Sequence, residues 1–283
     1  MSISVSSSLP LSSVSRFHEI APGIGAGNPR PAGWRALADL DPIVLVGVTG
    51  AGKSTALSAL DARGIAYTLL PDRRVVTDRV IIPRYADGDV RDRVQRFAIT
   101  QRFTRDVAGG MAAVLAGLSA APALQQRPLV FDGLRGEAEV RHAAAVMPRA
   151  RFLVLTAPDM VRLMRLLGRG DAFDRVALAS SNGGSDEGFS LDGADGILTP
   201  AEQARLCAEV NAGRLNAADV RAKFTIIAAE RRNYDPDRAV DALMEMAPER
   251  TLVVDTTRSG PAEVGEALAR LLPEVPHAAA AAA

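Results

Sequence analysis

The sequence has little cysteine and histidine, no excess of either charge and no long apolar run. Its single cysteine, Cys207, excludes an intrachain disulfide and a zinc site made of several cysteines. It also favours a reducing compartment, so we expect a cytoplasmic protein. Lys plus Arg and Asp plus Glu each number 33. A nucleic-acid-binding chain needs a basic excess to neutralise phosphates, so no nucleic-acid partner is expected.

Both ends of the sequence are of low complexity. Residues 1–40 are rich in serine and then in glycine and proline, and they lack the basic and apolar regions of a signal peptide. We expect a flexible tail there, with an organelle transit peptide as the alternative, and a disordered alanine-rich tail over 276–283. The longest uncharged run, 107–126, is broken by Gly109, Gly110 and Pro122, so no membrane span is expected.

Strand-like and helix-like segments alternate between residues 41 and 275. Short apolar runs predict buried strands at 43–46, 65–70, 129–131, 152–155 and 251–254. Helical patterns lie between them, at 53–62, 91–118, 136–146 and 159–167. This alternation predicts an α/β fold with three layers (αβα), in which a parallel five-stranded sheet is covered by helices on both faces.

The segment from about 176 to 250 interrupts the alternation. It begins with a stretch rich in glycine, serine and aspartate, and helices with N-caps at Thr199, Asn216 and Asp235 follow. We interpret it as a helical insertion within one nucleotide-binding domain. A protein partner could bind to this insertion.

The chemistry-bearing motif is Gly-Val-Thr-Gly-Ala-Gly-Lys-Ser-Thr at 47–55, which fits G-x-x-x-x-G-K-[ST]. We call it the phosphate loop. A predicted strand precedes it and a predicted helix follows it, so backbone N–H groups and the helix N-terminus can face phosphate oxygens. Lys53 is expected to reach the β- and γ-phosphates and Ser54 to ligate Mg²⁺. The predicted contacts of ATP are Gly47, Thr49, Gly50, Ala51, Gly52, Lys53, Ser54 and Thr55.

A second acidic signal follows the predicted strand 129–131. Asp132 ends this strand, where a carboxylate can hold the magnesium water shell. The segment Asp132-Gly133-Leu134-Arg135, with Glu139, resembles the nucleotide-kinase branch of P-loop proteins: the Asp-Gly-Phe-Pro-Arg segment of adenylate kinases and a similar segment of archaeal kinase-like proteins. The resemblance implies that Asp132 is a metal-binding catalytic residue and that Arg135 contacts a substrate phosphate. The proline of the adenylate kinases is missing here.

Three arginines on the predicted helix 159–167 and just beyond it have the spacing of one helix face. They are Arg162, Arg165 and Arg169, at i, i+3 and i+7. The resemblance implies a lid in this place, whose guanidinium groups neutralise the transferring phosphoryl group. Arg165 and Arg169 are then the expected catalytic residues and Arg162 a substrate-binding one. The alternative is a solvated basic face.

Further polar residues follow the predicted strand 65–70. The resemblance implies that an acceptor binds near the tips of the second and third strands. Asp72 is then the expected base or the group that orients an acceptor hydroxyl, and Arg79 and Arg84 are expected to hold an anionic acceptor. The alternative is a polar surface loop.

Together these residues predict a Mg²⁺-dependent phosphotransferase that uses ATP and acts on a small-molecule or nucleotide acceptor. The alternative is a P-loop ATPase or a nucleotide-dependent regulator without an acceptor. A GTP-specific switch is disfavoured, because no Asn-Lys-x-Asp sequence is present to bind guanine.

Overall fold

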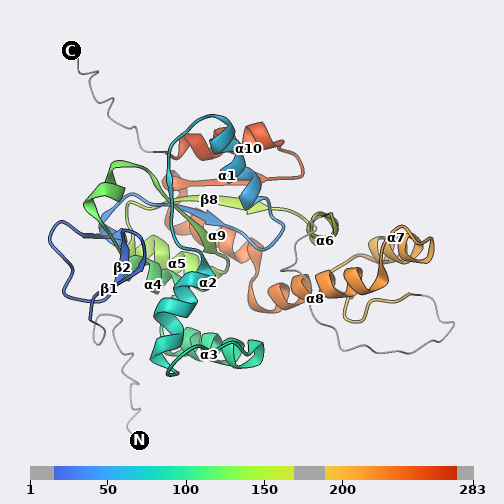
Figure 1. Cartoon of the computed structure of the whole chain (residues 1–283). Coiled ribbons are helices and arrows are strands. Elements are labelled where there is room, and N and C mark those ends of the chain that lie inside the picture. The colour runs from blue at the N-terminus through green and yellow to red at the C-terminus, as the bar shows by residue number, and fades with distance from the viewer. Residues whose placement is uncertain (1–15, 169–188, 273–283) are drawn as a thin grey trace, which may run out of the picture.

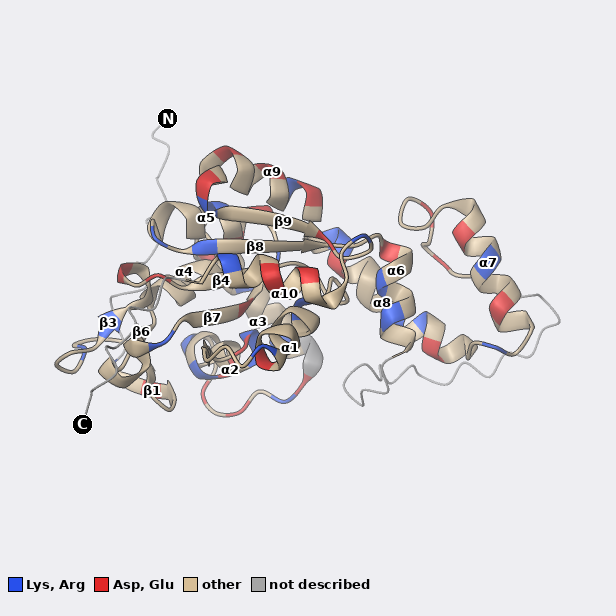
Figure 2. Cartoon of the chain, turned by 90° about the horizontal axis from the view of Figure 1, so that it is seen from above, with Lys and Arg blue, Asp and Glu red and all other residues tan. Residues whose placement is uncertain are grey.

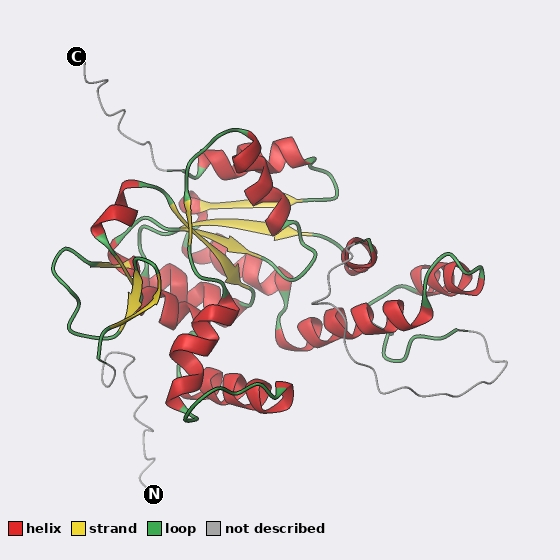
Figure 3. Ribbon diagram, in the orientation of Figure 1, coloured by secondary structure: helices red, strands yellow, loops and turns green. Residues whose placement is uncertain are grey.

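A five-stranded parallel sheet lies at the centre of the protein, between helices on both faces (Figures 1 and 3). The structure is a computed structural model and describes residues 16–168 and 189–272. The strand order is β5-β7-β4-β8-β9. The strands are β4 (Ile43–Val46), β5 (Thr68–Leu69), β7 (Leu129–Leu134), β8 (Arg151–Thr156) and β9 (Thr251–Asp255). The predicted α/β fold with a parallel five-stranded sheet is confirmed.

Strand β4 is the central strand, and all four of its residues are buried. It pairs in parallel with β7 and with β8. Because the strands run in the same direction, their carboxyl ends meet at one edge of the sheet. The segments after β4, β7 and β9 therefore come together there, which is where ligands bind in sheets of this kind.

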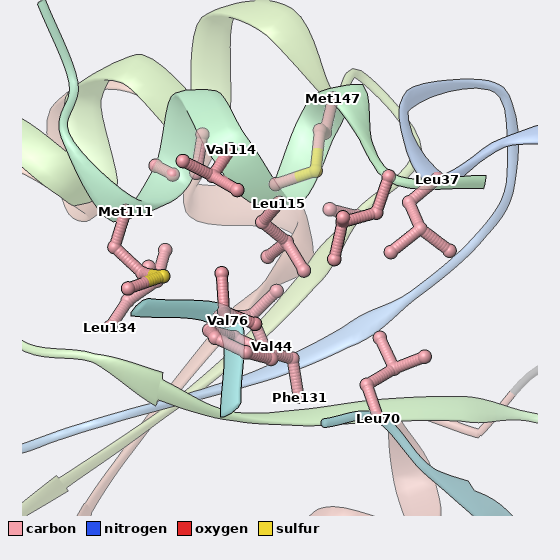
Figure 4. Close-up of a cluster of buried hydrophobic side chains, with 14 of the residues drawn as sticks. Leu37, Val44, Leu70, Val76, Met111, Val114, Leu115, Phe131, Leu134 and Met147 are labelled. Carbon is pink, nitrogen blue, oxygen red and sulfur yellow. The ribbon is translucent and has the colours of Figure 1, made fainter. Parts of the chain in front are cut away.

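Two cores hold the helices to the sheet. On one face, α1 (Lys53–Ala62) packs against α10 (Pro261–Arg270) through Leu60, Val264 and Leu268. On the other face lie α4 (Met111–Gly117), α5 (Glu137–Val146) and α9 (Pro236–Met246). Figure 4 shows part of this second core, where Phe131 of β7 packs among aliphatic side chains. Burying an apolar side chain of this size stabilises a fold by about 1.5–3 kcal/mol.

The segment before β4 differs from the flexible tail expected over 1–40. Its described part forms β1 (His18–Ala21), β2 (Ile24–Ala26), β3 (Arg35–Ala36) and η1 (Leu37–Asp39). With β6 (Ser119–Ala120) these strands make a second, antiparallel sheet in the order β1-β2-β6-β3. Ile24 and Leu37 are buried in the larger core. The prediction was wrong for the described part, because Gly23, with a φ angle of +73°, turns the chain between the paired strands β1 and β2. Residues 1–15 and the expected tail 276–283 lie outside the described residues.

The helix expected over 91–118 is two helices. The first is α3 (Arg93–Asp106), and α4 begins at Met111. Gly109 and Gly110 separate them with φ angles of +82° and +48°, which residues with a side chain rarely adopt. Before α3, the chain forms α2 (Arg73–Val76), η2 (Thr77–Ile81) and η3 (Ile82–Arg84); η4 (Pro122–Gln126) and η6 (Pro248–Arg250) precede β7 and β9.

The helical insertion is shorter than predicted. The helices begin at the expected caps, as α7 (Pro200–Asn211), α8 (Ala217–Asn233) and α9. However, α9 packs on α5 and belongs to the core of the sheet. Residues 200–233, which we call the α7–α8 arm, extend away from the sheet (Figures 1 and 2).

A third, small core joins the arm to the body of the protein. Phe224 and Ile227 of α8 pack with Leu163 and Leu166 of α6 (Asp159–Leu167) and with Leu206 of α7. Helix α6 follows β8 directly, so the arm is attached next to the carboxyl edge of the sheet. Within the described ranges, no helix is both long enough and apolar enough to cross a membrane.

Candidate functional site

The phosphate loop joins the end of β4 to the start of α1. Its three glycines, Gly47, Gly50 and Gly52, have φ angles of +149°, +82° and +112°. A Cβ atom at Gly47 would lie 2.7 Å from the carbonyl oxygen of Leu155 in β8. The path of the loop therefore requires glycine at this point, and α1 begins directly after Gly52 with unpaired N–H groups at its N-terminus.

Lys53 lies folded over the loop. Its Nζ donates to the carbonyl oxygens of Gly47 at 2.8 Å and Val48 at 3.2 Å, and it lies 3.7 Å from Asp132 Oδ1. Burial, with a smaller contribution from Arg135, lowers the pKa of Lys53 to about 8, and the carboxylate of Asp132 limits this shift. The ammonium group therefore remains mostly charged at neutral pH, as phosphate binding requires.

A cavity of about 490 Å³ opens beside the loop. It is formed by the phosphate loop, the start of α2 and the end of β7. Its lining residues are Thr49, Gly50, Gly52, Lys53, Ser54, Asp72, Arg73, Arg74, Asp132, Gly133 and Arg135. Five of the eight residues expected to contact ATP therefore line the same cavity as Asp72, Asp132 and Arg135, whereas Gly47, Ala51 and Thr55 do not.

The donor set in this cavity fits a magnesium ion. Within the part of the chain that the structure describes, Asp132 Oδ1 is buried and accepts no hydrogen bond, although a buried carboxylate oxygen is normally paired. The hydroxyl group of Ser54 lines the same cavity. A carboxylate and a hydroxyl group are hard oxygen ligands of the kind that Mg²⁺ prefers beside nucleotide phosphates.

Arg135 forms part of the cavity wall. Its Nη1 donates to Glu230 Oε1 at 2.8 Å, and its backbone N–H donates to Glu139 Oε2 at 2.9 Å. Its Nε is buried and has no hydrogen-bond partner among residues 16–168 and 189–272. The guanidinium carbon lies 6.0 Å from the centre of the Tyr234 ring, within the range of a cation–π contact. The Nε donor of Arg135 is therefore available to a ligand.

Arg73 also lies close to the Tyr234 ring. Its Nη1 donates to the carbonyl oxygen of Gly133 at 2.6 Å and to Glu139 Oε1 at 2.8 Å. Its guanidinium carbon is also 6.0 Å from the centre of the Tyr234 ring. Glu139 and Tyr234 thus hold α2 against the end of β7, which fixes the shape of the cavity.

Arg162 does not occupy the substrate-facing position expected for it. It is only 1% exposed and pairs with Asp159 and with Glu230 Oε2. Its Nε donates to the carbonyl oxygen of Thr49 at 2.8 Å. Arg231 completes the network by donating from Nε to Asp159 Oδ2 at 2.6 Å. Arg162 therefore connects α6 and α8 to the phosphate loop.

Arg165 contacts the phosphate loop through backbone oxygen atoms. Its Nη1 donates to Gly50 O at 3.0 Å and to Thr256 Oγ1 at 2.8 Å, and its Nη2 donates to Thr256 O at 2.8 Å. Thr256 Oγ1 in turn lies 2.9 Å from Ala51 O. Arg165 thus connects α6, the loop and the end of β9. Arg169 lies outside the described residues.

The residues expected to hold the acceptor are only partly brought together. Asp72 lines the cavity, and its Oδ1 accepts from the backbone N–H of Val75 at 2.8 Å as the N-cap of α2. Arg79 and Arg84 are exposed and do not line this cavity. The chain turns away from the site through η2 and η3, and Arg73 and Arg74 lie at the cavity instead.

Two residues of the site had no signal in the sequence. Glu230 contacts Thr49 across 181 positions, and Tyr234 contacts Arg73 across 161 positions. Both lie at the end of an ordinary helix, α8, so only their place in the fold brings them to the loop. Glu139 stands in the segment that resembles kinase-like proteins, but its pairing with Arg73 was not expected.

A protein-family model matches the part of the chain that holds the phosphate loop. Residues 43–181 match the model of a protein family described as an AAA domain. Among solved structures, the chain is similar to a gluconokinase from Sinorhizobium meliloti 1021. The sequence identity is 14%, the TM-score is 0.35, and the match covers 84% of this chain and 95% of the other. No curated protein matches the sequence significantly. Residues 43–181, which contain the phosphate loop and Asp132, thus resemble a P-loop family of the nucleotide-kinase-like branch, and that family implies nucleotide binding.

Proposed function

We propose that the protein is a Mg²⁺-dependent phosphotransferase that moves the γ-phosphoryl group of ATP to a small-molecule or nucleotide acceptor. One observation carries this proposal. The cavity at the phosphate loop is also lined by Asp72, Arg73 and Arg74 of a separate segment, which nucleotide binding alone does not need. A second substrate has room there.

Each residue on the nucleotide side of the site has a proposed role. The loop N–H groups and Lys53 bind the β- and γ-phosphates, and Ser54 and Asp132 would hold Mg²⁺. When bound, the ion neutralises part of the phosphate charge. Arg165 fixes the loop through Gly50 and Thr256, and Arg169 remains the proposed lid arginine that contacts the phosphoryl group.

The acceptor side supports direct transfer. An acceptor oxygen forms the new bond to the γ-phosphorus while the bond from this phosphorus to the bridging oxygen breaks, and ADP leaves. Asp72 orients the acceptor hydroxyl group or accepts its proton. The free Nε donor of Arg135 and the nearby arginine side chains favour an acceptor that carries an anionic group.

The second candidate is an ATPase or nucleotide-dependent regulator. The observation in its favour is the contact of Glu230, in the α7–α8 arm, with Thr49 of the phosphate loop. Through this contact a change in the loop can reach the arm, where a protein partner would bind.

The test that separates them is phosphate transfer from labelled MgATP to a panel of nucleotides, sugars and cofactor precursors. We expect one class of acceptor to become labelled, with much slower phosphate release in its absence. Phosphate release that is the same with every acceptor and with none would contradict the kinase and favour the ATPase.

Replacing Asp132 with asparagine tests the metal site. The variant Asp132→Asn keeps the size of the side chain and removes its charge, so we expect turnover to fall about 10²-fold and the magnesium concentration for half-maximal rate to rise. Turnover measured against MgCl₂ concentration gives both values. The matched control is Asp89→Asn, whose side chain is 87% exposed and should leave both unchanged. An unaltered magnesium dependence in Asp132→Asn would remove Asp132 from the metal site.

A further inference from the structure

The last turn of α8 and the residue after it contact most elements of the candidate site. Glu230 contacts the phosphate loop, the end of β7 and α6. Arg231 contacts Asp159 at the start of α6, and Tyr234 lies beside Arg73 and Arg135. Glu230 and Arg231 belong to the α7–α8 arm, and Tyr234 directly follows it. The C-terminal end of the arm therefore forms part of the candidate site.

We propose that Glu230 is a positioning residue for phosphoryl transfer. Its carboxylate holds Thr49 of the phosphate loop and Arg135 of the cavity wall in one fixed arrangement, without touching the nucleotide or the acceptor. This inference rests on the proposed function of the site.

The hydrogen bonds of Glu230 support a positioning role. Its carboxylate is 5% exposed and accepts from Thr49 N at 3.1 and 3.2 Å, from Thr49 Oγ1 at 2.6 Å and from Arg135 Nη1 at 2.8 Å. It also accepts from Arg162 Nη2. Both oxygen atoms are therefore occupied by donors of the protein, so Glu230 does not serve as a base toward a substrate.

The orientation of Arg135 depends on this carboxylate. Among the described residues, the bond to Glu230 is the only hydrogen bond made by the Arg135 guanidinium group, and its Nε has no partner. Without Glu230, only the contact with the Tyr234 ring restrains it. A group that stabilises developing charge is effective when it is already in place before the reaction.

Loss of Glu230 should affect turnover more than ATP affinity. Lys53 and the N–H groups at the start of α1, which are expected to bind phosphate, make no hydrogen bond to Glu230 within the described residues. Removing a negative charge near a polyanion also favours its binding, which opposes any loss from a looser loop. The expected signature is therefore a lower kcat with a nearly unchanged Kd for ATP.

The experiment compares three variants of the full-length chain. Glu230→Gln removes the charge, Glu230→Asp keeps it on a shorter side chain, and Glu209→Gln is the matched control. Glu209 lies in the same arm, away from the phosphate loop, and its salt bridge is to Arg214, which is 60% exposed. The measurements are kcat for MgATP, with the best acceptor or with water, Kd for ATP by equilibrium binding, and amide hydrogen exchange at Thr49.

We expect Glu230→Gln to lower kcat about tenfold or more, with Kd within about threefold of the wild type. Glu230→Asp should recover part of the rate, and Glu209→Gln should equal the wild type. Exchange at Thr49 should accelerate in Glu230→Gln, because its N–H donates to this carboxylate. Thr49→Val is a second test of the same contact. It removes only the hydroxyl group that donates to Glu230, so the loss of kcat should be smaller.

The proposal is overturned if kcat and Thr49 exchange stay at wild-type values in Glu230→Gln. It is also overturned if Kd rises as much as kcat falls, because Glu230 would then act on binding. A wild type that turns over no ATP would contradict the proposed function itself. In that case Thr49 exchange still decides whether Glu230 fixes the loop.

Discussion

Lys53→Ala is expected to lower MgATP turnover by about 10²- to 10³-fold, the magnitude found when one donor to a developing oxyanion is removed. Nζ is held between the carbonyl oxygens of Gly47 and Val48 and beside Asp132, so it already lies at the mouth of the loop. Its charge is also mostly present at neutral pH. Turnover with saturating MgATP, before and after the substitution, measures the effect.

Two controls make this result specific. Lys53→Arg keeps the charge, but we expect it to be nearly as inactive, because a planar guanidinium group does not fit a position that holds a compact ammonium group only 12% exposed. The sequence has only two lysines, Lys53 and Lys223, among 33 basic residues. The use of lysine at position 53, in a chain that otherwise favours arginine, is consistent with this expectation. Arg127→Ala removes an exposed charge just before β7, at the opposite edge of the sheet, and should be silent. If Lys53→Ala retains activity, the assignment of the phosphate loop is wrong.

Local sequence signals were sufficient for the sheet and most helices. Helix α1 covers Lys53–Ala62 as predicted, because a glycine loop leads directly into it. Thr199, Asn216 and Asp235 each accept a backbone hydrogen bond as N-caps. These features depend on residues within one or two turns, so the sequence alone contains the information.

Short strands could not be predicted in the same way. Strands β1, β2 and β3 have two to four residues, and β2 and β3 pair with Ser119 and Ala120, which lie more than 80 positions further along the chain. Such strands carry no periodicity of their own, and their stability comes from distant partners. The assignment of α9 to the sheet likewise depends on its packing against α5.

The site also contains some features that local sequence predicts and others that depend on distant contacts. The curl of 47–55 follows from its glycines, and the meeting of Asp132 with Lys53 follows from the parallel pairing of β4 and β7. The burial of Arg162 could not be predicted from the sequence, because its helical spacing fits a lid arginine as well as a member of a buried ion-pair network. Its contact with Glu230 spans 68 positions, and that distant partner decides between the two.

The buried charge network leads to the largest expected change in stability. Arg162→Met keeps much of the side-chain volume but removes the cation that pairs with Asp159 and Glu230. Breaking a buried ion pair from one side leaves an uncompensated charge, and we expect the free energy of unfolding to fall by about 3 kcal/mol. Chemical denaturation of the ligand-free protein measures this value. Arg214→Ala breaks the exposed pair with Glu209 and should cost less than about 1 kcal/mol.

A double variant separates the unpaired charge from the lost packing. In Arg162→Met with Glu230→Gln, one of the two acids left behind is neutral, while Asp159 still pairs with Arg231. If the cost of Arg162→Met comes mainly from an uncompensated carboxylate, the double variant should be less destabilised than the sum of the two single variants by about 1 kcal/mol or more. Strict additivity would attribute the loss to packing around Arg162 instead. A single variant as stable as the wild type would mean that Arg231, Arg135 and Thr49 satisfy both carboxylates on their own.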